Sequence, residues 1–299
     1  MKAKSAKRLY RALAVFLGIL VFLAALIISV LIADAVCERS AHTTPSYARV
    51  DITEVLDKKE EWTEDELRLL YRQTGLGSAA LLEMRRQHEE QLTFEDGEYL
   101  SFSEKVLPFQ DALFYEGETE HELVADVSKR DLMKNFRAPV APVMEAGDVF
   151  VNSSTHTLGF RNGHAAIVLD EYGTVLESLE LGSDSAAAMN GHLWFAESSN
   201  FILLRLKNVD KNTRARIASD ARENLTGIPY FIGVGVLSKK YQGIRPRSTH
   251  CSHLVWQAFV NAGYDIDSNG GIVVTPQDIA RSPYFEVIQV YGFDPEKLW

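Results

Sequence analysis

The sequence predicts an α+β fold preceded by one membrane-spanning helix. Two observations lead to this class. Residues 12–33 form an uninterrupted apolar stretch near the N-terminus. From residue 147 onwards, β-like runs and helical runs follow in the order strand, hairpin, strand, helix, helix, strand. That order lacks the regular alternation of βαβ units and therefore favours α+β.

The composition is that of an acidic, folded chain. It has 299 residues, 46% of them hydrophobic, which is enough for one sizeable core plus something smaller. The formal net charge is −10 and no long basic block follows the first dozen residues, so we expect no nucleic-acid partner. Two cysteines, Cys37 and Cys251, can form at most one bridge, which excludes a disulfide-built scaffold.

The N-terminal segment predicts a membrane anchor. Residues 12–33 are 22 uncharged residues, and at about 1.5 Å each they span the roughly 30 Å core of a bilayer. Cleaved signal peptides usually have a shorter apolar region, and Asp34-Ala35-Val36 before Cys37 is a poor lipoprotein signal. We predict an uncleaved signal anchor in a bacterial plasma membrane. The basic residues 1–11 place the N-terminus in the cytoplasm and the rest outside.

A helical region lies between this anchor and the main domain. Residues 62–76 predict a helix in which Thr63 and Glu66 have capping-box spacing, and Ser78 starts a second helix. The predicted organisation is a cytoplasmic tail at 1–11, a transmembrane anchor at 12–33, a juxtamembrane stalk at 34–61, a helical accessory region at 62–146 and the main domain at 147–299.

The main domain is divided into elements by its periodicity and turn signals. Glu171-Tyr172-Gly173 marks the turn of a hairpin, and Thr275 with Pro276 starts a short helical turn. The expected strands are 147–151, the hairpin 163–181, 200–208 and 284–292, and the expected longer helices are 211–227 and 251–262.

Cys251 is the candidate nucleophile. It starts a predicted helix, where free backbone N–H groups and the helix dipole favour a thiolate. The alternative is a structural cysteine used as a small hydrophobe. Nearby Cys37 is expected to be a spectator rather than a disulfide partner of Cys251, although acylation or an intermolecular disulfide is open to it.

His164 and Glu177 are the candidate partners of the thiol. His164 heads an apolar strand, and Glu177 falls opposite or diagonal to it on the returning strand. A carboxylate between in-facing Val175 and Leu179 is costly unless it is paired, and an imidazole is a natural partner. The alternatives are a solvent-facing histidine and an edge-strand Glu177 in solvent, since a one-residue register shift would turn Ser178 inward instead.

Residues 147–295 resemble a known family. The resemblance rests on Gly147-Asp148, the strands GHAAIVL and VLES, Pro229-Tyr230, CSHLVWQAF and IVVTPQDIARSP. These segments are similar to those of permuted papain-like cysteine amidases and peptidases, the YiiX/YaeF-like branch of the NlpC-type cysteine hydrolases. In that family the histidine strand precedes the cysteine helix, as it does here.

The resemblance implies a permuted papain-like fold, with the cysteine helix packed on an antiparallel sheet, and thiol chemistry without a cofactor. Carried over by position, Cys251 is the nucleophile, His164 the general base and Glu177 the orienting acid. Tyr230 matches a tyrosine that this family often places near the site. It is a candidate substrate-binding residue that donates to an oxyanion, or equally a core aromatic.

These residues are compatible with more than one function. The favoured one is a membrane-anchored, extracytoplasmic cysteine hydrolase that cleaves an amide, peptide or acyl bond of the cell envelope, in a peptidoglycan peptide or an acyl-amide lipid. The same resemblance leaves open a lipid acyltransferase and a catalytically inactive binding module. A zinc site of Cys251, His253 and His164 is disfavoured, because helix phase turns His253 away from the thiol. We expect His250 and His253 to be surface or supporting residues rather than partners of the thiol.

Overall fold

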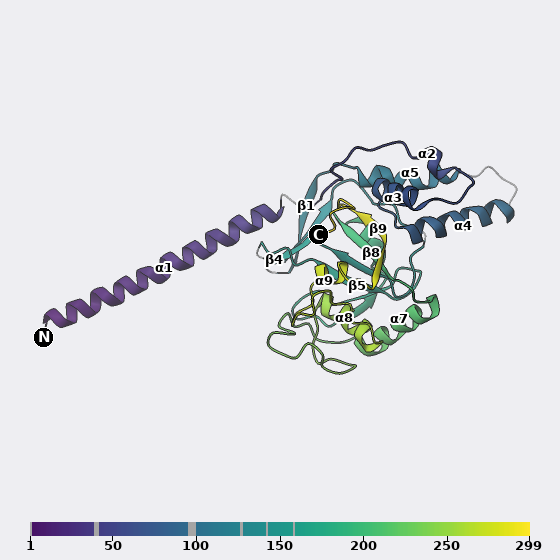
Figure 1. The fold of residues 1–299 in the computed structure, drawn as a ribbon. Helices are drawn as coiled ribbons and strands as arrows, with labels where there is room; N and C mark the ends of the chain where they lie inside the picture. Colours follow the sequence, from purple (N-terminus) through teal and green to yellow (C-terminus); the bar gives the residue numbers. More distant parts are fainter. Residues whose placement is uncertain (1, 39–41, 95–99, 126–127, 142, 158) are drawn as a thin grey trace.

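The computed structural model describes residues 2–38, 42–94, 100–125, 128–141, 143–157 and 159–299. Helix α1 (Lys2–Glu38) extends away from a body that contains the other elements (Figure 1). Within it, Tyr10–Val36 is long and apolar enough to cross a membrane, as a membrane anchor or a signal sequence is. The body combines helices with antiparallel sheets, so the predicted α+β class is confirmed.

The body is built around a six-stranded antiparallel sheet. Its spatial order is β7-β6-β5-β3-β8-β9. The strands are β3 (Val149–Asn152), β5 (His164–Val168), β6 (Val175–Glu177), β7 (Ala186–Ala188), β8 (Phe201–Leu206) and β9 (Phe285–Tyr291). The predicted strands and hairpin all lie in this sheet, and short β7 was not anticipated.

Both faces of the sheet are apolar, because its central strands are buried on both sides. In β3, Val149 and Val151 face one hydrophobic cluster, whereas Phe150 faces the other. The first cluster is covered by α7 (Lys211–Leu225), α8 (Cys251–Asn261) and α9 (Pro276–Ala280). Helix α8 packs on β5, and this contact brings the cysteine helix to the histidine strand.

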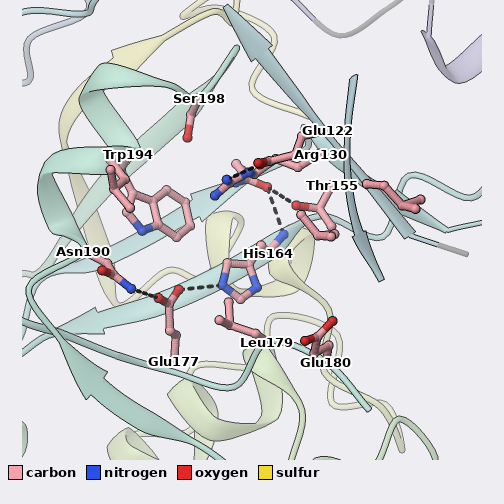
Figure 2. A pocket seen from close by; sticks show the side chains of 14 residues that line it. Glu122, Arg130, Thr155, His164, Glu177, Leu179, Glu180, Asn190, Trp194 and Ser198 are labelled. Atoms are coloured by element: carbon pink, nitrogen blue, oxygen red, sulfur yellow. Dashed lines mark hydrogen bonds and ion pairs between the residues drawn. The ribbon is translucent and has the colours of Figure 1, made fainter. Parts of the chain in front are cut away.

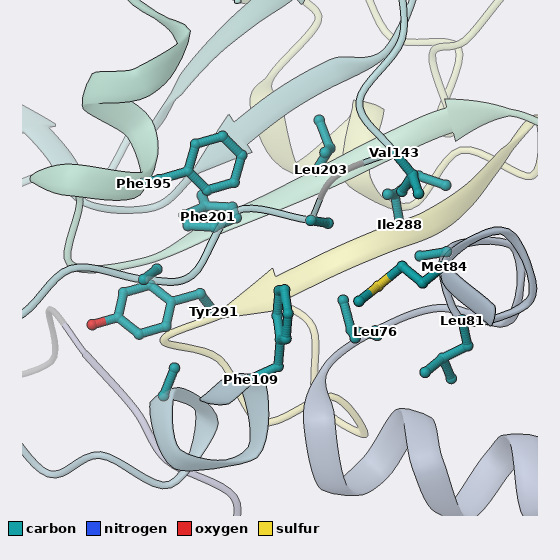
Figure 3. Close-up of a cluster of buried hydrophobic side chains, with 14 of the residues drawn as sticks. Leu76, Leu81, Met84, Phe109, Val143, Phe195, Phe201, Leu203, Ile288 and Tyr291 are labelled. Atoms are coloured by element: carbon teal, nitrogen blue, oxygen red, sulfur yellow. The ribbon is translucent and has the colours of Figure 1, made fainter. Parts of the chain in front are cut away.

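The opposite face is covered by helices from residues 53–113 (Figures 1 and 3). They are α2 (Thr53–Leu56), α3 (Glu64–Thr74), α4 (Ser78–Phe94) and α5 (Phe102–Leu113). The predicted capping box is confirmed, since Thr63 accepts from the backbone of Glu66 at the start of α3. The accessory helices therefore share a core with the sheet, together with α6 (Gly191–Ala196), which the sequence did not predict.

The link between α3 and α4 also closes the outer edge of the sheet. Gly77 N donates to Ile288 O at 3.0 Å, and Val290 N donates to Gly75 O at 2.8 Å. A Cβ on Gly77 would lie 1.7 Å from Val287 O, so only glycine allows this approach. Covering the edge strand β9 in this way prevents it from pairing with a strand of another chain.

A second, three-stranded sheet joins α1 to the body. It has the order β1-β2-β4, with β1 (Thr119–Ala125), β2 (Ser128–Met133) and β4 (Thr155–Thr157). Lys129 Nζ lies 3.0 Å from the carboxylate of Asp34, near the end of α1. The region predicted as helical at 62–146 thus contains two strands as well as helices.

Candidate active site

Cys251 is the first residue of α8, at the mouth of a cavity. It is buried, with 9% of its surface exposed, and it is a free thiol. The preceding His250 is the N-cap and has an extended backbone. Because Cys251 occupies the first helical position, its amide has no acceptor within the helix. The side chain of Cys37 lies outside the residues whose side chains are described.

His164 is held at the start of β5 by its backbone and by its ring. Its amide N donates to Asn152 Oδ1 at 3.0 Å, and its ring stacks on Trp194 with a centroid separation of 5.6 Å. The chain enters the strand through Gly163, whose φ is +69° and where a Cβ would lie 2.2 Å from Asn152 O. A residue with a side chain at 163 would therefore displace His164.

Glu177 contacts the imidazole from the neighbouring strand. His164 Nε2 lies 2.9 Å from Glu177 Oε2, and Asn190 Nδ2 donates to Glu177 Oε1 at 3.1 Å (Figure 2). Val168 pairs with Val175, and this register sets Glu177 opposite Ala166, two residues from His164. The predicted diagonal relationship is therefore the one present, and the alternative of Glu177 in solvent is wrong, since Glu177 is buried.

The ring of His164 also lies beside the thiol of Cys251: both side chains line the same cavity, and each shifts the pKa of the other. Since Nε2 is engaged by Glu177, Nδ1 is the nitrogen that is free for the sulfur. The structure thus brings together all three residues predicted to act on the substrate bond. His164 lies between the other two, with its side chain 13% exposed.

These contacts favour an ion pair of thiolate and imidazolium. Burial alone would raise the pKa of the Cys251 thiol, but the neighbouring side chains of His164 and His250 lower it to about 5. Burial would lower the pKa of His164, but neighbouring Cys251 and Glu177 raise it to about 10. Burial likewise opposes ionisation of Glu177, yet the contact with His164 keeps the pKa of its carboxyl below the ordinary value.

The two histidines that flank Cys251 behave differently from each other. His250 is the N-cap of α8: its Nδ1 accepts from His253 N at 3.4 Å, so it is a supporting residue as expected, and it also helps to lower the pKa of the Cys251 thiol. His253 turns away, as helix phase predicts: its Nε2 donates to Lys240 O at 2.8 Å, and its Nδ1 lies 2.9 Å from Thr249 Oγ1. Both side chains are buried rather than on the surface.

Two open cavities meet at His164. One, of about 360 Å³, extends past Glu177 to Asn190, Trp194 and the pair Glu122–Arg130 (Figure 2). The other, of about 380 Å³, lies over Cys251. Its lining includes half-buried Tyr230 and the aliphatic side chains Leu179, Leu181 and Ile232. Burial and the nearby thiolate raise the pKa of Tyr230, so its phenol stays protonated and able to donate.

Among the described residues, a group of side chains that could hold a metal ion lies away from Cys251 and His164. Single ligand atoms of His121, Asp131 and His156 lie within 4.8 Å of one another, on the three-stranded sheet. Asp131 already accepts from Arg161 at 2.8 Å, and both imidazoles contact the same carboxylate oxygen. The protein's own guanidinium and imidazole groups therefore compensate this buried carboxylate.

Comparisons with known proteins cover about half of the chain. No protein-family model matches it. It is 28% identical over 149 residues to the uncharacterized protein YycO of Bacillus subtilis (strain 168). The match covers 49% of this chain and 56% of YycO, so it spans little more than half of that relative. Among solved structures, it is similar to the metalloprotein YiiX of Escherichia coli O157:H7, with a TM-score of 0.37 and 14% identity over 48% of this chain and 96% of that one.

Several supporting residues were missed by the sequence analysis. Asn190 and Trp194 come from α6 and the turn before it, and Asn152 comes from the end of β3. None of them has a fixed sequence spacing from Cys251 or His164 that would single it out.

Proposed function

We propose that this chain is a cysteine hydrolase with Cys251 as nucleophile, His164 as general acid and base, and Glu177 as the orienting carboxylate. The observation that carries the proposal is the position of His164, which contacts Glu177 through Nε2 and lines one cavity with Cys251, whose pKa it lowers. A nucleophile, an adjacent base and a third group that orients the base are the parts that thiol catalysis needs.

The reaction would proceed by acyl transfer. The Cys251 thiolate attacks the carbonyl carbon, and the tetrahedral intermediate collapses as the C–N bond breaks and His164 gives its proton to the leaving amine. The neutral imidazole then takes a proton from water, which attacks the thioester. The C–S bond breaks, the acid leaves, and the thiolate–imidazolium pair is restored.

Two donors are placed for the oxyanion. The amide N–H of Cys251, at the start of α8, is unsatisfied within the helix. Tyr230 lines the same cavity as Cys251 and carries a protonated phenol. Preorganised donors aimed at the developing charge are usually the largest source of acceleration.

The lining of the cavities favours an amide substrate that has a polar portion, which would occupy the cavity beside Glu177. Glu122, Arg130 and Asn190 offer charged and amide groups beside Glu177, as a peptide of the cell envelope requires. The cavity over Cys251 is more aliphatic, through Leu179, Leu181 and Ile232. This lining supports an acyl-amide lipid as a second candidate substrate.

The fold and location assigned from the sequence belong to the same proposal. The strand with His164 precedes the helix with Cys251, which is the order of the permuted papain-like hydrolases. We infer that α1 is an uncleaved anchor, with basic residues 1–11 in the cytoplasm and the catalytic domain outside. Protease accessibility of the domain in sealed spheroplasts tests this orientation.

Turnover of defined substrates tests the activity. The purified full-length chain is incubated with peptidoglycan peptides and, separately, with N-acyl amide lipids, and the products are read by mass spectrometry. We expect cleavage of one class by the wild-type and Cys37→Ala chains and none by Cys251→Ala. Ligand binding without any product, equal in the wild-type and Cys251→Ala chains, would instead identify an inactive binding module.

A further inference from the structure

We propose that the loop of residues 231–247 is a second membrane contact, which rests on the anionic surface of the bilayer that α1 enters. The loop precedes α8 and contributes Ile232 to the cavity over Cys251. In Figure 1 it is the green segment that extends from the body beside α8, on the side from which α1 leaves.

The first observation is an exposed apolar surface. Long aliphatic side chains of the loop face solvent, with Leu237 exposed to 77% and Val236 to 63%. Ile272 joins them at 66%, because Gly235 lies directly against the backbone of residue 272. Ile232 and Ile244, each exposed to 60%, are further aliphatic side chains of the same loop. Exposed aliphatic groups gathered in one loop mark an interaction site.

The second observation is the charge of the loop. Residues 231–247 contain four basic residues and no acidic one, although the chain as a whole has a net charge of −10. Lys240 is paired with Asp267. Lys239, Arg245 and Arg247 are exposed, and Arg245 also donates to Asn224 O and Thr226 O. Exposed aliphatic groups flanked by basic side chains and Tyr241 match the boundary between acyl chains and anionic headgroups.

The third observation is the position of the loop relative to α1. Asp34, near the end of α1, pairs with Lys129 of β2 and lies 3.5 Å from His156 of β4. Ser128, which precedes Lys129, and Thr157, which follows His156, line the same cavity as Ile232. The end of the apolar helix and the loop thus lie on two sides of one cavity, so a bilayer around α1 is within reach of the loop.

A membrane explains these three observations better than a protein partner does. A protein interface needs a complementary shape, whereas a bilayer needs only aliphatic depth and basic headgroup contacts, both of which the loop supplies. If the proposed function holds, the cavity over Cys251 opens at the bilayer surface and receives amide substrates that are held in the membrane.

Lipid quenching tests the contact directly. Leu237→Cys is made in the full-length chain that also carries Cys37→Ala and Cys251→Ala, labelled with bimane and placed in nanodiscs with brominated lipids. We expect strong quenching at residue 237 and little at the control position Leu82→Cys, which is 50% exposed on α4. Quenching should be several-fold stronger with phosphatidylglycerol than with phosphatidylcholine, and changing Lys239, Arg245 and Arg247 to Gln should remove that difference.

Two outcomes would overturn the proposal. One is quenching at 237 no greater than at 82 in either lipid. The other is a blue shift of the probe that depends on protein concentration rather than on lipid, which would identify a second copy of the chain as the occupant. Because the labelled chain lacks Cys251, neither outcome depends on whether the chain is a hydrolase.

Discussion

His164 Nε2 lies 2.9 Å from Glu177 Oε2, across two neighbouring strands of one sheet. Glu177 is buried, and its second oxygen is bonded by Asn190, so the carboxylate can move little. This contact engages Nε2 and leaves Nδ1 as the nitrogen available to the thiol of Cys251, which lines the same cavity. Catalysis by His164 should therefore depend on this fixed geometry.

Glu177→Gln should weaken catalysis without unfolding the chain. The amide oxygen of the variant can still accept from His164 Nε2, but the negative charge that stabilises the imidazolium is lost. A charge-assisted hydrogen bond contributes ~1.5–3 kcal/mol, so we expect kcat/KM to fall by about 10–100-fold. Steady-state kinetics on the cleaved substrate provide the measurement. Asn190→Ala, which removes only the outer hydrogen bond, should cost about 10-fold or less, and an equal loss in both variants would argue against the charge effect.

The pH dependence of turnover should be bell-shaped with a broad plateau. The pKa of Cys251 is lowered to about 5, so activity is lost as pH falls through 5 and the thiolate is protonated. The pKa of His164 is raised to about 10, so activity is lost as pH rises through 10 and no proton remains for the leaving amine. Measuring kcat/KM between pH 4 and 11 checks both limbs. An activity that rises steadily to pH 9 would instead indicate that the Cys251 thiol has an ordinary pKa.

Asp148→Ala should be strongly destabilising. Asp148 is fully buried beneath the sheet and accepts from Arg205 at 2.7 and 2.8 Å. The variant leaves buried Arg205 without its bidentate partner and with Glu145 at 3.7 Å, and removing one partner of a buried pair costs ~3–5 kcal/mol. Chemical denaturation measures this loss in the free energy of unfolding. The control is Asp111→Ala, whose ion pair with Arg49 is exposed, and it should cost less than ~1 kcal/mol. Similar losses in the two variants would contradict the role given to burial.

Much of the sheet and of the central contact could be predicted from local patterns. Period-two alternation from His164 onward and the turn at Gly173 set the register, and the register alone puts Glu177 diagonal to His164. The capping residues Thr63 and Thr275 marked helix starts correctly, because their side chains bond within the same turn. These features depend on neighbours that are close in sequence.

The rest depends on contacts between distant segments. Asn190 and Trp194 reach the site only because α6 folds over the sheet, and no periodicity in the sequence encodes that path. The burial of His250 has a different cause. As the N-cap it has an extended backbone and its Nδ1 accepts from His253 N, so its side chain lies over the first turn of α8 instead of facing solvent.

The pH dependence of thiol alkylation tests the central pair most directly. The full-length Cys37→Ala chain, in which Cys251 is the sole cysteine, is treated with iodoacetamide between pH 4 and 10, and the rate is read by mass spectrometry. Alkylation needs only the thiolate, so we predict a half-maximal rate near pH 5 and a shift to pH 8 or above in the His164→Ala variant. A wild-type thiol that stays unreactive at neutral pH, or whose rate profile is unchanged by His164→Ala, would contradict the proposed nucleophile.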